Sequence, residues 1–119
     1  ESNTKNVSNA VCFASVSTAH DLGATAIIAP SISGFTTRML SKWRPSATII
    51  GMSPSMTTVR QMQLQWGVTP VWSRRADTTD ELIESSAEEL KSRGMVHVGD
   101  TTVITAGVET NIMRVMTIE

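Results

Sequence analysis

The stretch ATAIIA, residues 24–29, is a short apolar run enclosed between a glycine and a proline. A run of this length without polar alternation is typical of a strand buried on both faces, as in a parallel sheet. Residues 47–52, ATIIGM, repeat the pattern and predict a second buried strand. Residues 68–72 predict a third strand, which Pro70 places at an edge because proline cannot donate to a ladder on both sides.

Helical patterns precede each of these strands. A first helix is predicted from Ser8 or Asn9 to a stop at Gly23. Its spacing predicts the following inner face: Val7, Val11, Ala14, Thr18 and Leu22. A second helix is predicted over residues 36–43, with Met39 and Leu40 inward and Pro45 beyond its end.

A third helix is predicted from about residue 53 to Trp66, with Val59, Met62 and Trp66 on one face. The fourth opens with a capping box formed by Thr78 and Glu81 and ends at Gly94. Its predicted inner residues are Leu82, Ala87 and Leu90.

Two more strands are predicted over residues 101–105 and 111–118. Only residues 106–110 join them, a length that suits a hairpin and excludes a crossover helix. The whole chain, residues 1–119, is therefore predicted to be one α/β domain. We expect a three-layer α/β/α sandwich whose mostly parallel five-stranded sheet has its last strand antiparallel.

Composition excludes several classes of protein. The chain has 10 basic and 11 acidic residues and a net charge of -1. It therefore lacks the excess of positive charge that binds nucleic acid or an anionic membrane. No apolar run is long enough to span a bilayer. Because the single cysteine, Cys12, lies in an apolar helical pattern, we expect a buried, inert thiol. Nothing indicates secretion, so we expect a cytoplasmic protein.

The segment after the first strand has the parts of a phosphate-binding loop. It carries four hydroxyls, from Ser31, Ser33, Thr36 and Thr37, around the flexible Gly34 at a helix start. Hydroxyls and amide groups converging at a helix N-terminus favour an anion. The alternative is a helix start capped by serine and threonine, which needs no ligand.

Two other strand ends are weaker candidates. Residues 53–58 combine hydroxyls with a helix start, but their proline and lack of glycine favour capping over ligand binding. Arg74 and Arg75 follow the third strand and could hold a second phosphate. The alternative for this pair is a solvated surface site.

No catalytic or metal site is predicted. The chain contains no Walker loop, no Gly-x-Gly-x-x-Gly and no Gly-x-Ser-x-Gly. His20 and His97 have no nucleophile or ligand cluster near them in sequence, so we expect both at the surface. The glutamates of the fourth helix indicate a solvated face.

Three blocks of sequence together resemble the C-terminal domain of pyruvate kinases. They keep the family's order and spacing over almost the whole chain. The matching blocks are LGATAII at 22–28, SISGFTTR at 31–38 and SKWRP at 41–45; IIGMSP at 49–54 and RQMQLQWGVTP at 60–70; and GDTTVITAG at 99–107 and TNIMRV at 110–115.

The resemblance implies that Ser31, Ser33, Gly34 and Thr36 lie on the segment that cradles the phosphate of a phosphorylated effector. This chain departs from the family at two places. Ile32 and Phe35 replace the usual glutamate and arginine of the loop. Only two residues separate Gly107 from Thr110, where the family commonly has a longer loop that folds over sugar phosphates.

The resemblance further implies a regulatory and assembly domain of a glycolytic enzyme that converts phosphoenolpyruvate and ADP to pyruvate and ATP. In that family the catalytic machinery, with its Mg²⁺ and K⁺, sits on a barrel that this sequence lacks, so no cofactor and no catalysis are expected here. The family is tetrameric, and the strand over residues 111–118 could pair across a two-fold axis. Two alternatives stay open: a free-standing phosphate-ester-binding module and a small enzyme.

Overall fold

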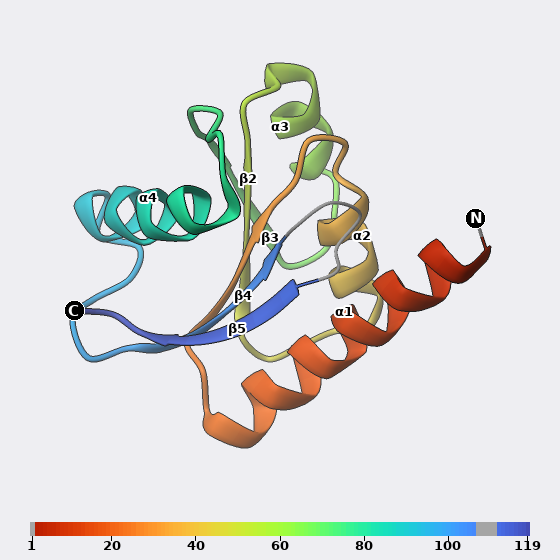
Figure 1. Ribbon diagram of the computed structural model, residues 1–119, viewed down its shortest axis with the longest axis horizontal. Coiled ribbons are helices and arrows are strands. Elements are labelled where there is room, and N and C mark those ends of the chain that lie inside the picture. Colours follow the sequence, from red (N-terminus) through yellow and green to blue (C-terminus); the bar gives the residue numbers. More distant parts are fainter. Residues whose placement is uncertain (1, 107–111) are drawn as a thin grey trace.

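The computed structural model describes residues 2–106 and 112–119, with only the backbone described for residues 2–6. Within these ranges the chain forms helices and strands in alternation and ends on two consecutive strands (Figure 1). Their bounds are α1 Ser2–Leu22, β1 Ala26–Pro30, α2 Phe35–Lys42, β2 Thr48–Ser53, α3 Met56–Met62, β3 Val68–Trp72, α4 Thr79–Ser92, β4 Thr101–Ala106 and β5 Ile112–Thr117.

The strands form one sheet in the order β3-β2-β1-β4-β5. The first four are parallel to one another, and Ile28 of β1 lies opposite both Ile50 of β2 and Ile104 of β4. β5 runs antiparallel to β4. The predicted sheet, the edge position of the Pro70 strand and the reversed last strand are thus confirmed. The predicted hairpin connection lies mostly outside the described residues.

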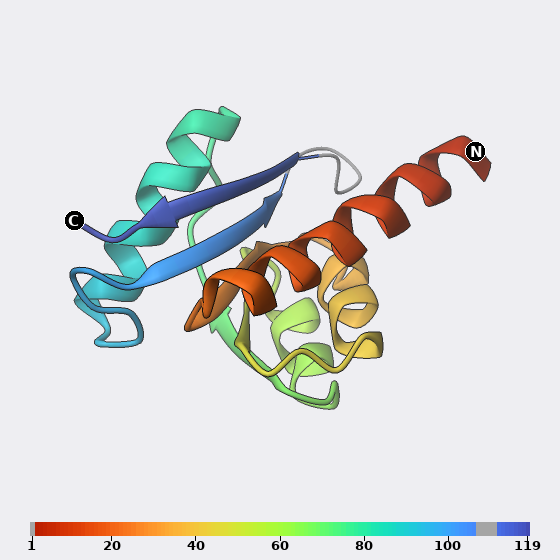
Figure 2. The same cartoon turned by 90° about the horizontal axis from the view of Figure 1, so that it is seen from below.

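Helices cover both faces of the sheet. Ile27 and Ile49 pack with Leu40 of α2 in one core cluster, while Ile28 and Ile50 pack in a second cluster that includes residues of α4. Neighbouring residues of a strand point to opposite faces, so these pairs place α2 and α4 on opposite sides. Figure 2 shows α1, α2 and α3 together on one side of the sheet and α4 on the other. The three-layer α/β/α architecture is confirmed.

The inner face of α1 differs from the predicted one. Val7 and Leu22, predicted to face inward, are about half exposed. The buried residues are small ones at helical spacing, namely Ser8, Cys12, Ser15 and Ala19. Ser15 can be buried because its Oγ donates to the Val11 carbonyl and accepts from Thr105 Oγ1 of β4, 2.8 Å away. Small side chains with satisfied hydroxyls let the helix approach the sheet closely. The helix also starts before Ser8, so Ser8 and Asn9 do not cap it.

The Cys12 thiol is buried, as predicted. Desolvation raises its pKa from an ordinary value of 9.0 to about 11. The folded state therefore holds the thiol proton more tightly than the unfolded chain does. The contribution of this thiol to the free energy of unfolding is complete below pH 9 and declines as pH rises toward 11.

We expect a thiol reagent at pH 8 to modify Cys12 only as fast as the chain opens, because the thiolate is the nucleophile. The rate of labelling, followed by mass spectrometry with and without denaturant, checks this. Labelling of the folded chain as fast as that of the unfolded chain would contradict the burial described here.

Two further predicted details need correction. α3 ends at Met62 rather than near Trp66, and the Trp66 side chain is 54% exposed. The buried residues of α4 are Ile83, Ser86 and Leu90, while the predicted Leu82 and Ala87 are half-buried against the same core. The predicted Thr78 cap is confirmed, since its side chain accepts from the backbone N–H of Glu81.

Candidate functional site

The carboxyl ends of β1, β2 and β3 meet at one edge of the sheet, where all three predicted ligand segments begin (Figure 1). In open α/β sheets this edge is where ligands bind. The three segments differ in how their polar groups are used.

The β1–α2 loop, residues 31–34, folds back on its own hydroxyls. Ser31 Oγ accepts from the Gly34 N–H at 2.8 Å, and Ser33 Oγ accepts from the Phe35 N–H at 3.3 Å. Gly34 lies at the N-cap of α2 with φ 83°, a left-handed conformation that favours glycine. Both serine hydroxyls thus accept from the start of the helix and keep their own protons available to a ligand.

Of the five predicted phosphate ligands, Ser31 and Ser33 lie near the surface, and Gly34 is buried next to them. Ser33 is exposed, Ser31 is half-buried, and Gly34 lies between them and the helix. Thr36 and Thr37 are buried beneath this loop. The Thr37 hydroxyl donates to the Gly34 carbonyl at 3.0 Å, so in this structure it supports the loop and does not face solvent.

Two side chains from the α3 region hold the loop from its other side. Thr58 Oγ1 donates to the Ile32 carbonyl at 2.6 Å, and Gln65 Nε2 donates to the Gly34 carbonyl at 3.4 Å. The other amide atom, Gln65 Oε1, is buried and has no hydrogen-bond partner among the described residues. The sequence marks Thr58 only as part of a hydroxyl-rich helix start and gives Gln65 no such role, because their partners lie 26 and 31 positions away in the chain.

The segment after β2 behaves as a helix cap. Ser53 Oγ accepts from the Ser55 N–H, and Ser55 Oγ accepts from the Thr58 N–H, each at 3.2 Å. The indole N–H of Trp72 donates to the Pro54 carbonyl at 3.0 Å. These bonds agree with the interpretation of this segment as the N-terminal cap of α3.

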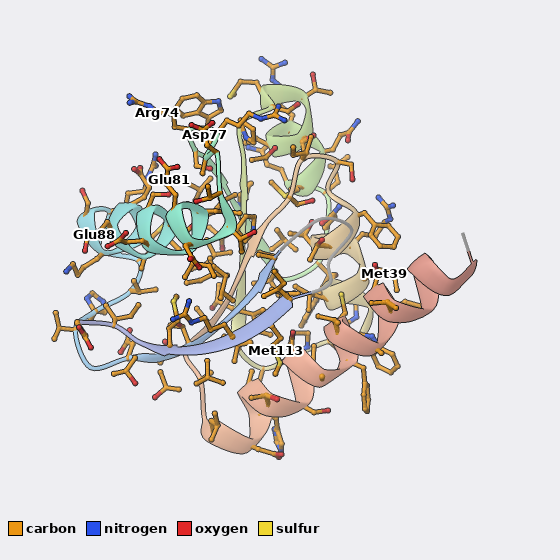
Figure 3. The ribbon with its side chains drawn as sticks, viewed as in Figure 1. Met39, Arg74, Asp77, Glu81, Glu88 and Met113 are labelled. Atoms are coloured by element: carbon orange, nitrogen blue, oxygen red, sulfur yellow. The ribbon has the colours of Figure 1, made fainter. Side chains whose placement is uncertain are left out.

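Arg74 and Arg75 are exposed, and neither forms an ion pair within the described part of the chain. β2 separates their strand from β1, a distance of about 9–10 Å between strands. Figure 3 places Arg74 and Asp77 near the N-terminal end of α4. The pair thus follows a strand that is two positions from β1, and its role as a second phosphate contact stays a prediction.

The sequence from residue 22 to residue 76 carries charge of one sign, and Asp77 follows it directly after β3. Between Asp21 and Asp77 the sequence has no acidic residue, and it has six basic ones: Arg38, Lys42, Arg44, Arg60, Arg74 and Arg75. The whole-chain net charge conceals this segregation. An anion at the β1–α2 loop would meet no carboxylate from β1, α2, β2, α3 or β3.

The described residues contain no group of three histidine, cysteine or acidic side chains able to hold a metal ion. His20 and His97 are both exposed, as predicted. No described helix has the length and apolar character needed to cross a membrane.

Comparison with known proteins gives a family for this fold. The family model described as "Pyruvate kinase, alpha/beta domain" matches residues 9–116. The chain belongs to this pyruvate kinase domain family. The resemblance seen in the three sequence blocks is thus confirmed.

Individual pyruvate kinases agree with this membership. The enzyme of Clostridium acetobutylicum is 40% identical over 108 residues, which cover 91% of this chain and 23% of that protein. The enzyme of Lactobacillus delbrueckii subsp. bulgaricus is 39% identical, over 95% of this chain and 20% of that protein. The chain therefore spans about a fifth of the length of these relatives.

The fold agrees as well. A crystal structure of a pyruvate kinase from Cryptosporidium parvum superposes with a TM-score of 0.86 at 27% sequence identity. That match covers 95% of this chain and 23% of the solved one.

Proposed function

We propose that this chain is the regulatory and assembly domain of a pyruvate kinase and that its β1–α2 loop binds a phosphorylated small-molecule effector. The parent enzyme would act in glycolysis in the cytoplasm, where it converts phosphoenolpyruvate and ADP to pyruvate and ATP. Its catalytic barrel, with Mg²⁺ and K⁺, would be the partner of this domain, which does not itself catalyse. The observation that carries the proposal is the paired serine hydroxyls at the α2 N-terminus, within a stretch of sequence, residues 22–76, that has no acidic residue.

The loop supplies the groups that a phosphate needs. The hydroxyls of Ser31 and Ser33 accept from backbone amides, and each keeps its own proton to donate to a ligand. The N-terminal end of α2 adds the positive end of a helix dipole. Together these groups favour a dianion over a neutral ligand.

The loop itself carries no cation, because Phe35 stands where the family usually has an arginine. Ile32 stands where the family usually has a glutamate. Arg38, one turn further along α2, places its guanidinium carbon 5.7 Å from the centroid of the Phe35 ring. Long side chains in helices point back toward the N-terminus, which brings this charge toward the loop. Arg38 would thus supply the positive charge that Phe35 does not.

The assembly role rests on β5. This strand pairs with β4 on one side, and its Arg114 and Val115 are exposed. An exposed antiparallel edge strand can pair with its own copy across a two-fold axis. A homo-oligomer built in this way would let an effector bias subunit packing, provided that two packing states bind it differently.

The effector site is tested by titrating the chain with inorganic phosphate and then with sugar phosphates and nucleotides, while following Tm. We expect one compound to raise Tm saturably, because a ligand at 100 times its Kd stabilises the folded state by about 2.7 kcal/mol. Ser33→Ala should abolish the rise, and the exposed Ser46→Ala, in the α2–β2 turn, should leave it intact. No response at millimolar concentration, or an equal response in Ser33→Ala, would contradict the site.

A further inference from the structure

A side chain in the first turn of α3 binds the backbone of the β1–α2 loop. Thr58 Oγ1 donates to the Ile32 carbonyl at 2.6 Å, although 26 positions separate the two residues in the chain. α3 lies beside the start of α2 in Figure 1. Thr58 is 5% exposed, so this hydrogen bond is shielded from water. The bond ties the middle of the loop to α3.

The local alternative for the Thr58 hydroxyl is used by another donor. A threonine in a helix often donates to the carbonyl four residues earlier. For Thr58 that residue is Pro54, whose carbonyl accepts from the indole N–H of Trp72 at 3.0 Å. The Thr58 N–H donates to Ser55 Oγ at the N-cap, which fixes the backbone of Thr58. The hydroxyl therefore reaches the loop from a fixed position.

The bond to the Ile32 carbonyl also sets the direction of the next N–H. The Ile32 carbonyl and the Ser33 N–H belong to one peptide group, and the described chain has no cis peptide bond. In a planar trans peptide these two groups point in opposite directions. Because Thr58 binds the carbonyl on the α3 side, the Ser33 N–H points away from α3, at a residue that is exposed to solvent.

The Ser33 N–H is not used by the loop itself. The N–H groups around it have acceptors: that of Ser31 donates to the Met52 carbonyl at 2.7 Å, and that of Gly34 donates to Ser31 Oγ at 2.8 Å. The Phe35 N–H donates to Ser33 Oγ at 3.3 Å. Within the described part of the chain no hydrogen bond uses the Ser33 N–H. This N–H is therefore available to a ligand.

We propose that Thr58 is a positioning residue for the effector. Its hydroxyl holds the Ile32–Ser33 peptide so that the Ser33 N–H and the hydroxyls of Ser31 and Ser33 bind the same anion. The inference rests on the phosphate site proposed above and adds to it a residue that does not touch the ligand. A donor held in place before binding does not have to be ordered during binding, and this preorganisation raises affinity.

Gln65 holds the same loop in a less specific way. Its Nε2 donates to the Gly34 carbonyl at 3.4 Å, but that carbonyl also accepts from two donors of α2, at 3.0 Å and 3.1 Å. Among the described residues the Ile32 carbonyl accepts from Thr58 only. Removal of the Gln65 amide therefore leaves its peptide held, whereas removal of the Thr58 hydroxyl releases the peptide that carries the Ser33 N–H.

The test measures the Kd of the chain for inorganic phosphate by amide chemical shifts, at constant ionic strength and at a temperature where every variant is folded. Thr58→Val keeps the shape of the side chain and removes the donor. We expect it to weaken phosphate binding by about tenfold or more, the loss typical of one hydrogen bond to a charged group. Thr58→Ser keeps the hydroxyl and should bind as the unaltered chain does.

Two variants serve as matched controls. Thr57→Val makes the same chemical change at the neighbouring, exposed position of α3 and should leave the Kd unchanged. Gln65→Leu removes the other donor to the loop and should weaken binding clearly less than Thr58→Val does. A general loosening of the loop would instead affect Thr58→Val and Gln65→Leu alike.

The Ser33 amide gives a signature that a merely structural role would not produce. Saturating phosphate should shift this resonance strongly in the unaltered chain and in Thr58→Ser, because its N–H donates to the anion. In Thr58→Val the shift at saturation should be much smaller. A merely structural role for Thr58 would lower Tm and leave both the Kd and this shift unchanged in the folded variant.

The outcomes separate the positioning role from the phosphate site. An unchanged Kd in folded Thr58→Val, an equal loss in Thr57→Val or Gln65→Leu, or failure of Thr58→Ser to retain binding would overturn the role of Thr58 and leave the site standing. An unaltered chain that binds no phosphate would overturn both.

Discussion

Leu40→Ala is expected to lower the free energy of unfolding by about 2–5 kcal/mol. Leu40 is fully buried and packs with Ile27 and Ile49, so it joins α2 to the sheet. Its truncation removes apolar contact and leaves a cavity between the helix and β1 and β2. The measurement is chemical denaturation followed by circular dichroism.

Met39→Ala is the matched control. Met39 is the neighbouring residue of α2 and only half-buried against the same core cluster, so we expect a clearly smaller loss. Equal losses for the two variants would contradict the inward direction assigned to Leu40. Because α2 presents the β1–α2 loop, Leu40→Ala should also weaken phosphate binding.

Gly51→Ala is expected to destabilise the fold by about 1–3 kcal/mol, because overpacking forces neighbours out of their positions. Gly51 lies in β2, where pairing on both sides leaves the backbone no room to move. A Cβ there would lie 2.6 Å from Met62 Sδ and 2.8 Å from Thr37 Cγ2. Thermal or chemical denaturation measures the loss.

Thr37→Ser provides the internal test of that explanation. Serine keeps the hydroxyl that donates to the Gly34 carbonyl and removes the methyl group that would meet the new Cβ. The double variant should therefore lose less than the sum of the two single losses. Strict additivity would mean that the contact between Gly51 and Thr37 is not the source of the strain.

Much of the architecture could be predicted because buried parallel strands have a distinctive local pattern. The runs around Ile27 and Ile49 are apolar and short, and Pro70 marks an edge strand by the donor it lacks. Element boundaries moved by one or two residues at most of these strands and at α2. Such shifts are expected, since hydrogen bonding and not residue type decides where an element ends.

The inner face of α1 could not be predicted from hydrophobicity. Val7 and Leu22 are more apolar than Ser8 and Ser15, yet the serines are buried. The burial of Ser15 depends on a partner distant in sequence, Thr105 on β4. The early end of α3 has a similar cause, because Ser41 and Arg44 hold Trp66 outside the helix.

The candidate site was only partly visible in the sequence. The hydroxyl-rich pattern around Gly34 indicated the loop, but it could not separate Ser31 and Ser33, which stay accessible, from Thr37, which is buried. The supporting donors, Thr58 and Gln65, act across α3 and leave no local motif. These roles follow from tertiary contacts alone.

The phosphate site at the β1–α2 loop is tested most directly by titrating the chain with inorganic phosphate, and then with the effector found by Tm, while following amide chemical shifts. We expect the largest shifts at the amides of Ser33, Gly34 and Phe35, with α4 unaffected. Shifts centred on Arg74 and Arg75, or spread over all exposed cations, would contradict a phosphate site at the β1–α2 loop.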